Sequence, residues 1–449
     1  MRLYIKSRLF LNGNLLLLLV YICVYLFNLQ FNTNTNHTKY FLFITYIFIV
    51  ISSIKHFSYF HSLNLFLYAF GLFLMGRIFL DIFLGIPSEF ADKWNNYWLS
   101  SYTIKEVNNS LTLALIGTGI GASFYKKIKL KKDKNKSIIR PLKIIIYILI
   151  PFCLAKLWLD YAQVRDGGYI TLYTGLKRSP FYLRASWYLL VTIFPLLLTD
   201  INNKKQFKYL VLLFIIIDGL NILQGARGAL FRPLAFFIWY YYKFISIKKV
   251  KLIKLAYFSI IIIFSSVLLL QLREKDTKVD NVLFYVMQSL SGSYYTHAYF
   301  IDYSNNFVNP SNFYILAPVV DYVKYLYDPD LKGHTLKRVE KTLSLDHKLT
   351  YEMATTSYLS GHGLGGSYIT EMYALGGKMG VFLISILLGY SIIYLENLFV
   401  IAETTRYIAW FWIGNLVWMP RAGLLDFIPS VIICYVFYKF LYRFQNSYD

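Results

Sequence analysis

The chain has few charged residues, and acidic residues are particularly scarce. Only 16% of its 449 residues are charged, and 46 Lys and Arg stand against 24 Asp and Glu. An average soluble domain carries about 25% charged residues. Hydrophobic residues make up 57% of the chain and aromatic residues 19%. This composition excludes a string of ordinary soluble domains, and no polar linker divides the chain into such units.

Cysteines and cofactor motifs are also scarce. The three cysteines, Cys23, Cys153 and Cys434, lie inside apolar blocks, without the spacing of a metal site or of a disulfide framework. The sequence has no His-Glu-x-x-His motif, no Walker phosphate-binding loop and no Gly-x-Ser-x-Gly nucleophile elbow. We therefore expect neither a bound metal nor a cofactor.

What the sequence does contain is a series of long apolar blocks separated by short basic segments. In lipid every backbone polar group must be paired within its own segment, so such blocks form helices that cross the membrane. We predict an all-α polytopic membrane protein with about twelve transmembrane helices, at 9–28, 40–54, 63–84, 107–125, 142–163, 185–199, 209–223, 229–245, 254–272, 368–395, 402–419 and 427–442.

The basic segments predict the orientation. The 126–141 segment has eight basic residues against one acidic residue, and 200–208 and 246–254 are also basic. Cytoplasmic loops of membrane proteins carry such an excess of Lys and Arg. If the spans alternate, these segments and the basic N-terminus fall on one side, so we predict that both termini are cytoplasmic. Topology also explains the formal net charge of +22, and we expect no nucleic-acid partner.

The longest segment between predicted spans, 273–367, has nine basic and ten acidic residues. A balanced charge is expected of a segment that is moved across the membrane. The segment is rich in Tyr and has apolar stretches, which favour short helices at the outer interface. We therefore predict three parts, with nine transmembrane helices in 1–272, a mostly helical outer loop domain in 273–367, and the last three transmembrane helices in 368–449.

Several arginines are predicted to lie on the outer face. Arg227 is in a Gly-Ala-Arg-Gly turn between two predicted spans, Arg232 follows it, and Arg421 is in a Pro-Arg-Ala-Gly turn between the last two spans. Guanidinium groups bind phosphate through a bidentate fork, so all three are candidate anion ligands. The alternatives are that Arg227 reaches lipid headgroups and that Arg421 forms a salt bridge with Asp426.

The outer segment 164–184 adds two further candidates, Arg165 and Arg184. This segment has four basic residues against one acidic residue, although outer loops usually lack such an excess. A basic outer loop favours an anionic ligand such as a diphosphate.

Two residues are candidate general bases. Glu371 opens the tenth predicted span after the glycine-rich run Gly361–Ser367, and it serves either chemistry or an ion pair between helices. His297 lies in the large outer loop. A lone histidine is more often structural than catalytic, and this alternative stays open for His297.

Together these features resemble the Wzy-type O-antigen polymerases of bacterial inner membranes. The resemblance covers the about twelve spans with a large outer loop before the tenth, and the Gly-Ala-Arg-Gly turn at 225–228. It also covers the run from Gly363 through Glu371 to Gly380, and Arg421-Ala422-Gly423, which is similar to the Arg-x-Gly of enterobacterial common antigen polymerases. It suggests a GT-C-like membrane glycosyltransferase.

The resemblance implies a specific chemistry. Such enzymes move a growing saccharide from undecaprenyl diphosphate to a hydroxyl of the next lipid-linked repeat unit, with lipid diphosphate as the leaving group. The diphosphate would then be bound by Arg227 and Arg421, with Arg165, Arg184 and Arg232 as further candidates. Glu371 or His297 would accept the hydroxyl proton. The expected partners are lipid-linked oligosaccharides, membrane lipids and a polysaccharide chain-length regulator.

Two other functions are compatible with these residues. An O-antigen ligase would use the same donor with a lipid A core acceptor. A flippase for lipid-linked oligosaccharides would catalyse no reaction, but transporters often contain internal repeats, and the sequence shows none.

Overall fold

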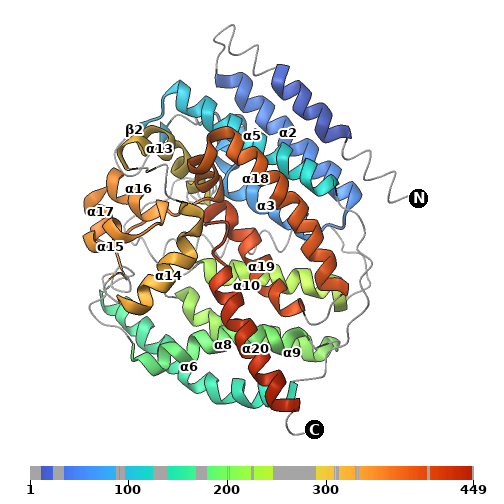
Figure 1. Cartoon of the computed structure of the whole chain (residues 1–449), viewed down its shortest axis with the longest axis vertical. Coiled ribbons are helices and arrows are strands. Elements are labelled where there is room, and N and C mark those ends of the chain that lie inside the picture. Colours follow the sequence, from blue (N-terminus) through green and yellow to red (C-terminus); the bar gives the residue numbers. More distant parts are fainter. Residues whose placement is uncertain are drawn as a thin grey trace.

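The computed structural model is a bundle of helices with a group of shorter helices at one end (Figure 1). The residues that it describes are 12–23, 35–86, 90–91, 97–124, 139–167, 179–199, 201, 203–223, 227–245, 290–307, 309, 313–328, 331, 333–401 and 405–446. They are helical except for loops and one short antiparallel pair, β1 (Phe90–Ala91) with β2 (Tyr97–Trp98).

Helices occupy the positions of the predicted spans wherever the structure describes them. They are Asn12–Cys23, α2 (Thr35–His56), α3 (Ser62–Phe73), α4 (Gly76–Leu84), α5 (Ser101–Ser123), α6 (Ile139–Gly167), α8 (Phe181–Thr199), α9 (Lys204–Leu223), α10 (Arg227–Tyr240) with the π-helix η1 (Tyr241–Ile245), α18 (Tyr368–Ile401), α19 (Arg406–Trp418) and α20 (Ile428–Asn446). The predicted span at 254–272 lies outside the described residues.

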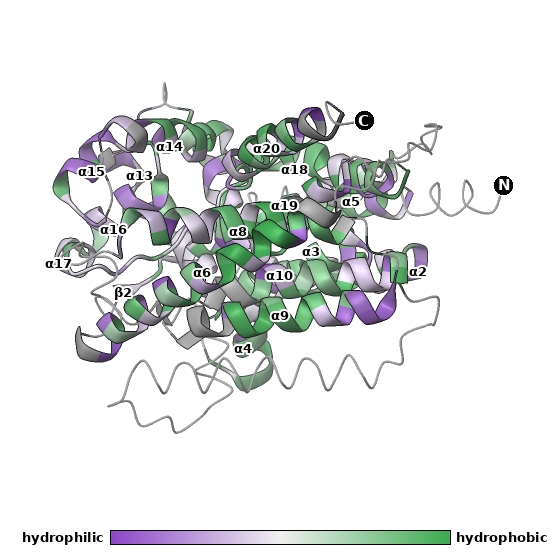
Figure 2. Ribbon diagram, turned by 90° about the horizontal axis from the view of Figure 1, so that it is seen from below, coloured by the Kyte–Doolittle hydropathy of each residue, from purple (hydrophilic) through white to green (hydrophobic). Residues whose placement is uncertain are grey.

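Four of these helices are long and apolar enough to cross a membrane by themselves: α2, α6, α8 and α18. A fifth span is formed if α3 and α4, which meet at a bend of 58°, are counted together. Figure 2 shows that α8 is largely hydrophobic, whereas α15 (Leu336–Lys341) is hydrophilic. The protein is therefore an all-helical, membrane-embedded protein, while the number twelve and the GT-C-like arrangement stay predictions.

The predicted loop domain contains the group of shorter helices. These are α13 (Gly292–Phe307), the 3-10 helix η2 (Tyr314–Leu316), α14 (Ala317–Tyr327), α15 (Leu336–Lys341), α16 (Leu345–Met353) and α17 (Thr355–Leu359). In Figure 1 they gather on the left, beside the beginning of α18. This group and the bundle together enclose the candidate site described below.

The centre of the bundle is the close packing of α5 against α18. A Cβ atom at Gly117 would lie 2.7 Å from the Phe382 carbonyl oxygen, and one at Gly121 would collide with the Ile386 carbonyl. From the other side, a Cβ at Gly389 would collide with the Thr118 carbonyl. Small residues thus allow the two backbones to approach closely, as in other membrane helix pairs.

Gly376 and Gly377 interrupt α18 instead of packing it against a neighbour. Gly377 has a φ of 57°, which favours glycine, and a Cβ at either position would meet nothing within 4 Å. Close helix packing therefore does not explain glycine at these two positions, whereas it does at Gly389. Glu106 of α5 joins the two sides of the break, because its carboxylate accepts from the Tyr373 hydroxyl at 3.2 Å and from Lys378 Nζ at 2.8 Å.

Candidate active site

A cavity of about 370 Å³ lies between the group of shorter helices and the ends of α10, α18 and α19. Its lining comes from segments far apart in the sequence: Arg232 from α10; Thr296 from α13; Ala317, Pro318, Asp321, Tyr322 and Tyr325 from α14; Arg338 from α15; Ser344, Leu345, Asp346, His347 and Leu349 from α16 and the residue before it; Gly365, Gly366 and Ser367 from the glycine-rich run; Thr370 and Glu371 from α18; Trp418 from α19; and Arg421, Ala422, Gly423 and Asp426 beyond it.

Two carboxylates meet at the turn that follows α19. The Leu424 N–H donates to Glu371 Oε2 at 2.9 Å, and the Gly423 N–H donates to Asp426 Oδ2 at 3.2 Å. A Cβ atom on residue 423 would lie 2.5 Å from Glu371 Oε1 and 2.7 Å from Asp426 Oδ1. A side chain at 423 would therefore displace the two carboxylates from their present positions.

Two arginines lie against one tryptophan on the same wall. The guanidinium carbons of Arg232 and Arg421 are 5.5 Å and 5.9 Å from the ring centre of Trp418. Arg421 Nη1 also donates to the Leu290 carbonyl at 3.4 Å. Cation–π contacts hold guanidinium groups in position, and guanidinium groups bind phosphate through a bidentate fork. This wall can therefore bind a phosphate or diphosphate.

The turn carboxylate Asp426 has an unusual charge environment. Burial raises the pKa of Asp426 to about 6, and Asp346 acts in the same direction, while Arg232 and the bond from the Gly423 N–H oppose them. The sequence left open a salt bridge between Arg421 and Asp426. The guanidinium group that lowers the pKa of Asp426 is instead that of Arg232.

The opposite wall, from α14 to α16, is rich in aromatic and hydrogen-bonding groups. Asp321 accepts from the Thr342 hydroxyl and, at 3.1 Å, from the Leu343 N–H. The Arg338 guanidinium lies 5.3 Å from the Tyr325 ring centre. Tyrosine rings and fixed polar groups of this kind suit the apolar faces and hydroxyls of a sugar.

A histidine pair lies in and behind this wall. His347 Nδ1 is 3.1 Å from the Tyr358 hydroxyl, and the His334 ring lies 4.6 Å from the ring of Tyr358. Burial lowers the pKa of His347 to about 4, and burial with the nearby Arg338 also lowers the pKa of His334. Both rings are thus neutral near pH 7.

Of the residues predicted from the sequence, Glu371, Arg232 and Arg421 line this one cavity. Within the described residues Glu371 is bound by the backbone of Leu424 and not by a basic side chain. Arg227 begins α10, but its side chain lies outside the described residues.

Three other predicted residues lie elsewhere. Arg165 is exposed near the end of α6, and Arg184 is half-buried in α8; neither lines the cavity. His297 is fully buried, and its ring packs edge-on against Tyr373 at 5.2 Å. Its neighbour Thr296 faces the cavity instead.

The sequence pattern did not reveal several lining residues. Trp418 precedes the Pro-Arg-Ala-Gly turn by only two positions, and its place beside a candidate anion ligand was the one available signal. Asp321, Tyr325 and Asp346 are brought to the cavity by the folding of the loop domain, which no local motif indicates.

The chain has one Asp-x-Asp sequence, Asp328-Pro329-Asp330, a spacing common in metal sites. The Asp328 carboxylate is bonded to Lys337 Nζ at 3.0 Å and to Lys341 Nζ at 3.4 Å, and Asp330 lies outside the described residues. In the part of the chain that the structure describes, no three His, Cys, Asp or Glu side chains gather in a metal-binding group.

Comparison with known proteins gives one match. No curated protein and no solved structure matches the chain. A family model described as O-antigen polysaccharide polymerase Wzy matches residues 10–448, which is nearly the whole length. The chain therefore belongs to the Wzy family of O-antigen polysaccharide polymerases.

Proposed function

We propose that this polymerase joins undecaprenyl-diphosphate-linked oligosaccharide repeat units at the periplasmic face of the bacterial inner membrane. The observation that carries the proposal is the meeting of Arg232, Glu371 and Arg421, from three distant segments, in one cavity between the bundle and the outer helices. Membership of the family supports polymerisation in O-antigen synthesis, and the cavity supports the choice of an anionic donor.

In the proposed reaction a hydroxyl of one lipid-linked repeat unit attacks the anomeric carbon of the growing saccharide. The new glycosidic C–O bond forms as the bond between that carbon and the diphosphate oxygen breaks, and undecaprenyl diphosphate leaves. Negative charge grows on the departing diphosphate. Arg232 and Arg421 stabilise it, because preorganised cations act most strongly where charge develops. Arg227, at the beginning of the same helix as Arg232, is a further candidate for this role.

The hydroxyl proton requires an acceptor, and Glu371 is our choice. Its carboxylate lines the cavity and is oriented by the Leu424 N–H. His297 remains the second candidate. Burial lowers the pKa of His297 to about 3, so the ring is an unprotonated base, but its position against Tyr373 directs it away from the cavity.

The proposed topology places the cavity on the periplasmic side and both termini in the cytoplasm. The 273–367 domain then covers the site from outside, and the tyrosines of α14 contact the saccharide. In this proposal a polysaccharide chain-length regulator is the protein partner, and membrane lipids surround the bundle.

The test is polymerisation by the purified protein in vesicles, with lipid-diphosphate repeat units as the sole substrate. We expect a ladder of lengthening lipid-linked products. Transfer only to an added lipid A core acceptor would instead identify a ligase, and movement of the substrate across the bilayer without new glycosidic bonds would identify a flippase. Deletion of the gene separates the first two functions in cells, because loss of a polymerase leaves single repeat units on the core and loss of a ligase leaves none.

A further inference from the structure

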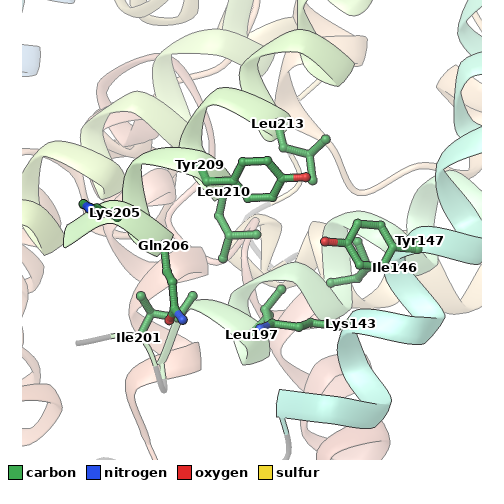
Figure 3. Close-up of a pocket in the computed structure, with 10 residues that line it drawn as sticks. All are labelled: Lys143, Ile146, Tyr147, Leu197, Ile201, Lys205, Gln206, Tyr209, Leu210 and Leu213. Carbon is green, nitrogen blue, oxygen red and sulfur yellow. The ribbon is translucent and has the colours of Figure 1, made fainter. Parts of the chain in front are cut away.

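A second cavity, of about 290 Å³, lies between α6, α8 and α9, and none of its lining residues belongs to the candidate active site. Figure 3 shows its lining: Lys143, Ile146 and Tyr147 from α6, Leu197 and Ile201 from α8 and the turn after it, and Lys205, Gln206, Tyr209, Leu210 and Leu213 from α9. Apolar side chains form most of the surface, and the hydroxyls of Tyr147 and Tyr209 face each other across it. We refer to this cavity as the lysine groove.

The charged groups of the lysine groove are all positive. Lys143 is half-buried and Lys205 is exposed. Within the residues that the structure describes, no carboxylate pairs with either ammonium group. Two lysines at one apolar groove produce a positive potential that an anion would neutralise.

The surfaces on either side of the groove are suited to lipid. Ile144 and Ile148 of α6 are about 60% exposed, at 61% and 59%, and Leu212 and Ile216 of α9 are 57% and 60% exposed. In a membrane-embedded bundle such side chains contact acyl chains. The lysines belong to the first two turns of α6 and α9, so they lie where these helices reach the edge of the bilayer.

We propose that the lysine groove binds an anionic glycerophospholipid, with one acyl chain against Ile146, Leu197 and Leu213 and the phosphate at the rim of the groove, in the positive potential of Lys143 and Lys205. Lysine binds phosphate as a point charge, and basic residues near the membrane surface attract anionic lipids. The volume is close to the lower limit of about 300 Å³ for ligand pockets, so the groove holds part of one chain while the rest of the lipid stays in the bilayer. This inference does not depend on the proposed function.

The first test is native mass spectrometry of the full-length protein, titrated with phosphatidylglycerol or with phosphatidylcholine of the same acyl chains. We expect the wild-type protein to retain one phosphatidylglycerol in preference to phosphatidylcholine. The double variant K143Q/K205Q should bind it about 25-fold more weakly, at about five-fold for each lysine. The matched control K204Q/K208Q removes two exposed lysines of α9 that do not line the groove, and it should bind like the wild type.

A second variant tests the groove itself. In Leu213→Trp a large side chain occupies the groove while both lysines remain, so the retained phosphatidylglycerol should be lost. Melting temperatures in lipid-free detergent check that each variant folds. Equal retention of the two lipids by the wild type would overturn the proposal. So would an equal loss of phosphatidylglycerol binding in K143Q/K205Q and K204Q/K208Q, or undiminished retention of phosphatidylglycerol by Leu213→Trp.

Discussion

Arg421 is the residue whose removal we expect to affect polymerisation most directly. Its guanidinium lies beside Trp418 and faces the cavity, where the leaving diphosphate would gain charge. Arg421→Ala should therefore slow chain extension by about 10²- to 10³-fold, the effect of removing one preorganised donor elsewhere. Arg421→Lys should restore little, because an ammonium group has no bidentate fork. The measurement is the initial rate at which the product ladder appears.

The matched control for this substitution is Arg443→Ala. Arg443 is an exposed arginine of α20 that does not line the cavity. Its loss changes the net charge of the protein equally but should leave the rate unchanged. Near-normal chain length in Arg421→Ala, at equal protein amounts, would remove Arg421 from the proposed site.

Asp426 gives a prediction about stability and pH. Because the pKa of Asp426 is raised to about 6 in the folded protein, the stability that its neutral form contributes is present at low pH and is lost as the pH rises through 6. Asn imitates the neutral carboxyl and can still accept from the Gly423 N–H. The melting temperature of Asp426→Asn, relative to the wild type, should therefore increase between about pH 4 and pH 6 and then stay level.

Asp328 is a control with the opposite sign. Hydrogen bonds from Lys337 lower the pKa of Asp328, so the ionised form stabilises the folded state at neutral pH and this contribution disappears as the pH falls. Asp328→Asn should thus melt at or below the wild-type temperature at pH 7 and approach it in acid. A parallel response of the two variants to pH would contradict the assignment for Asp426.

At the scale of elements, the contact of α5 with α18 depends on Gly389. Its added Cβ would collide with the backbone carbonyl of Thr118, which cannot move away as a side chain can. Gly389→Ala should destabilise the protein by about 1–3 kcal/mol, as overpacking does in other cores. The control is Gly376→Ala in the same helix, because a Cβ there meets nothing within 4 Å. The melting temperatures of the two variants are measured in detergent. Equal melting temperatures of Gly389→Ala and Gly376→Ala would argue against close packing of α5 on α18.

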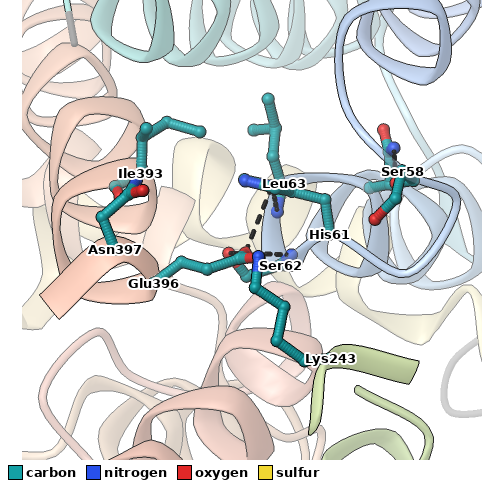
Figure 4. Close-up of polar contacts among 9 residues, drawn as sticks. Ser58, His61, Ser62, Leu63, Lys243, Ile393, Glu396 and Asn397 are labelled. Carbon is teal, nitrogen blue, oxygen red and sulfur yellow. Dashed lines mark hydrogen bonds and ion pairs between the residues drawn. The ribbon is translucent and has the colours of Figure 1, made fainter. Parts of the chain in front are cut away.

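The C-terminal end of α18 is held by a buried carboxylate. Glu396 accepts from the Ser62 backbone N–H at 2.7 Å and from Lys243 Nζ at 2.6 Å, and His61 Nδ1 lies 3.3 Å away (Figure 4). These contacts join α18 to the beginning of α3 and to η1. Removal of one partner leaves a buried charge uncompensated, which typically costs about 3–5 kcal/mol.

We therefore expect Lys243→Met to lower the unfolding free energy strongly, whereas Lys243→Met with Glu396→Gln should recover part of the loss. A double-mutant cycle of unfolding free energies measures the coupling. Additive effects would mean that the pair does not act as a unit.

For the whole molecule, the helix positions were predictable because lipid requires long apolar segments. The bend between α3 and α4 and the break at Gly377 were not, because Gly76-Arg77 and Gly376-Gly377-Lys378 lie within longer apolar blocks and do not by themselves indicate that a helix ends there. The number of spans is also difficult to predict from apolar length. α5 buries polar side chains such as Asn108, which accepts from the Tyr294 hydroxyl at 3.2 Å, so a central helix does not need the composition of one that faces lipid.

The candidate site was predictable on one wall only. Arg232, Glu371 and Arg421 were identified because charged and glycine residues next to apolar spans are conspicuous. The wall that contains Asp321 and Asp346 depends on how the loop helices pack, and that is a matter of contacts between distant segments. The direction of His297 was not predictable for this reason too, because it also depends on how the loop helices pack. His297 packs against Tyr373, whereas Thr296, one position before it, lines the cavity.

The arrangement of helix ends agrees with spans that alternate in direction, and the orientation of the protein stays a prediction that can be tested directly. Ends predicted to be cytoplasmic meet at Glu396, and ends predicted to be periplasmic meet at the cavity. Ser58 and Ser360 are exposed near these two places. In a Cys23→Ser background, which removes the exposed native thiol, Ser360→Cys should react with a membrane-impermeant maleimide in spheroplasts. Ser58→Cys should react only after the membrane is opened, and the reverse pattern would place the cavity, and with it the chemistry, on the cytoplasmic side.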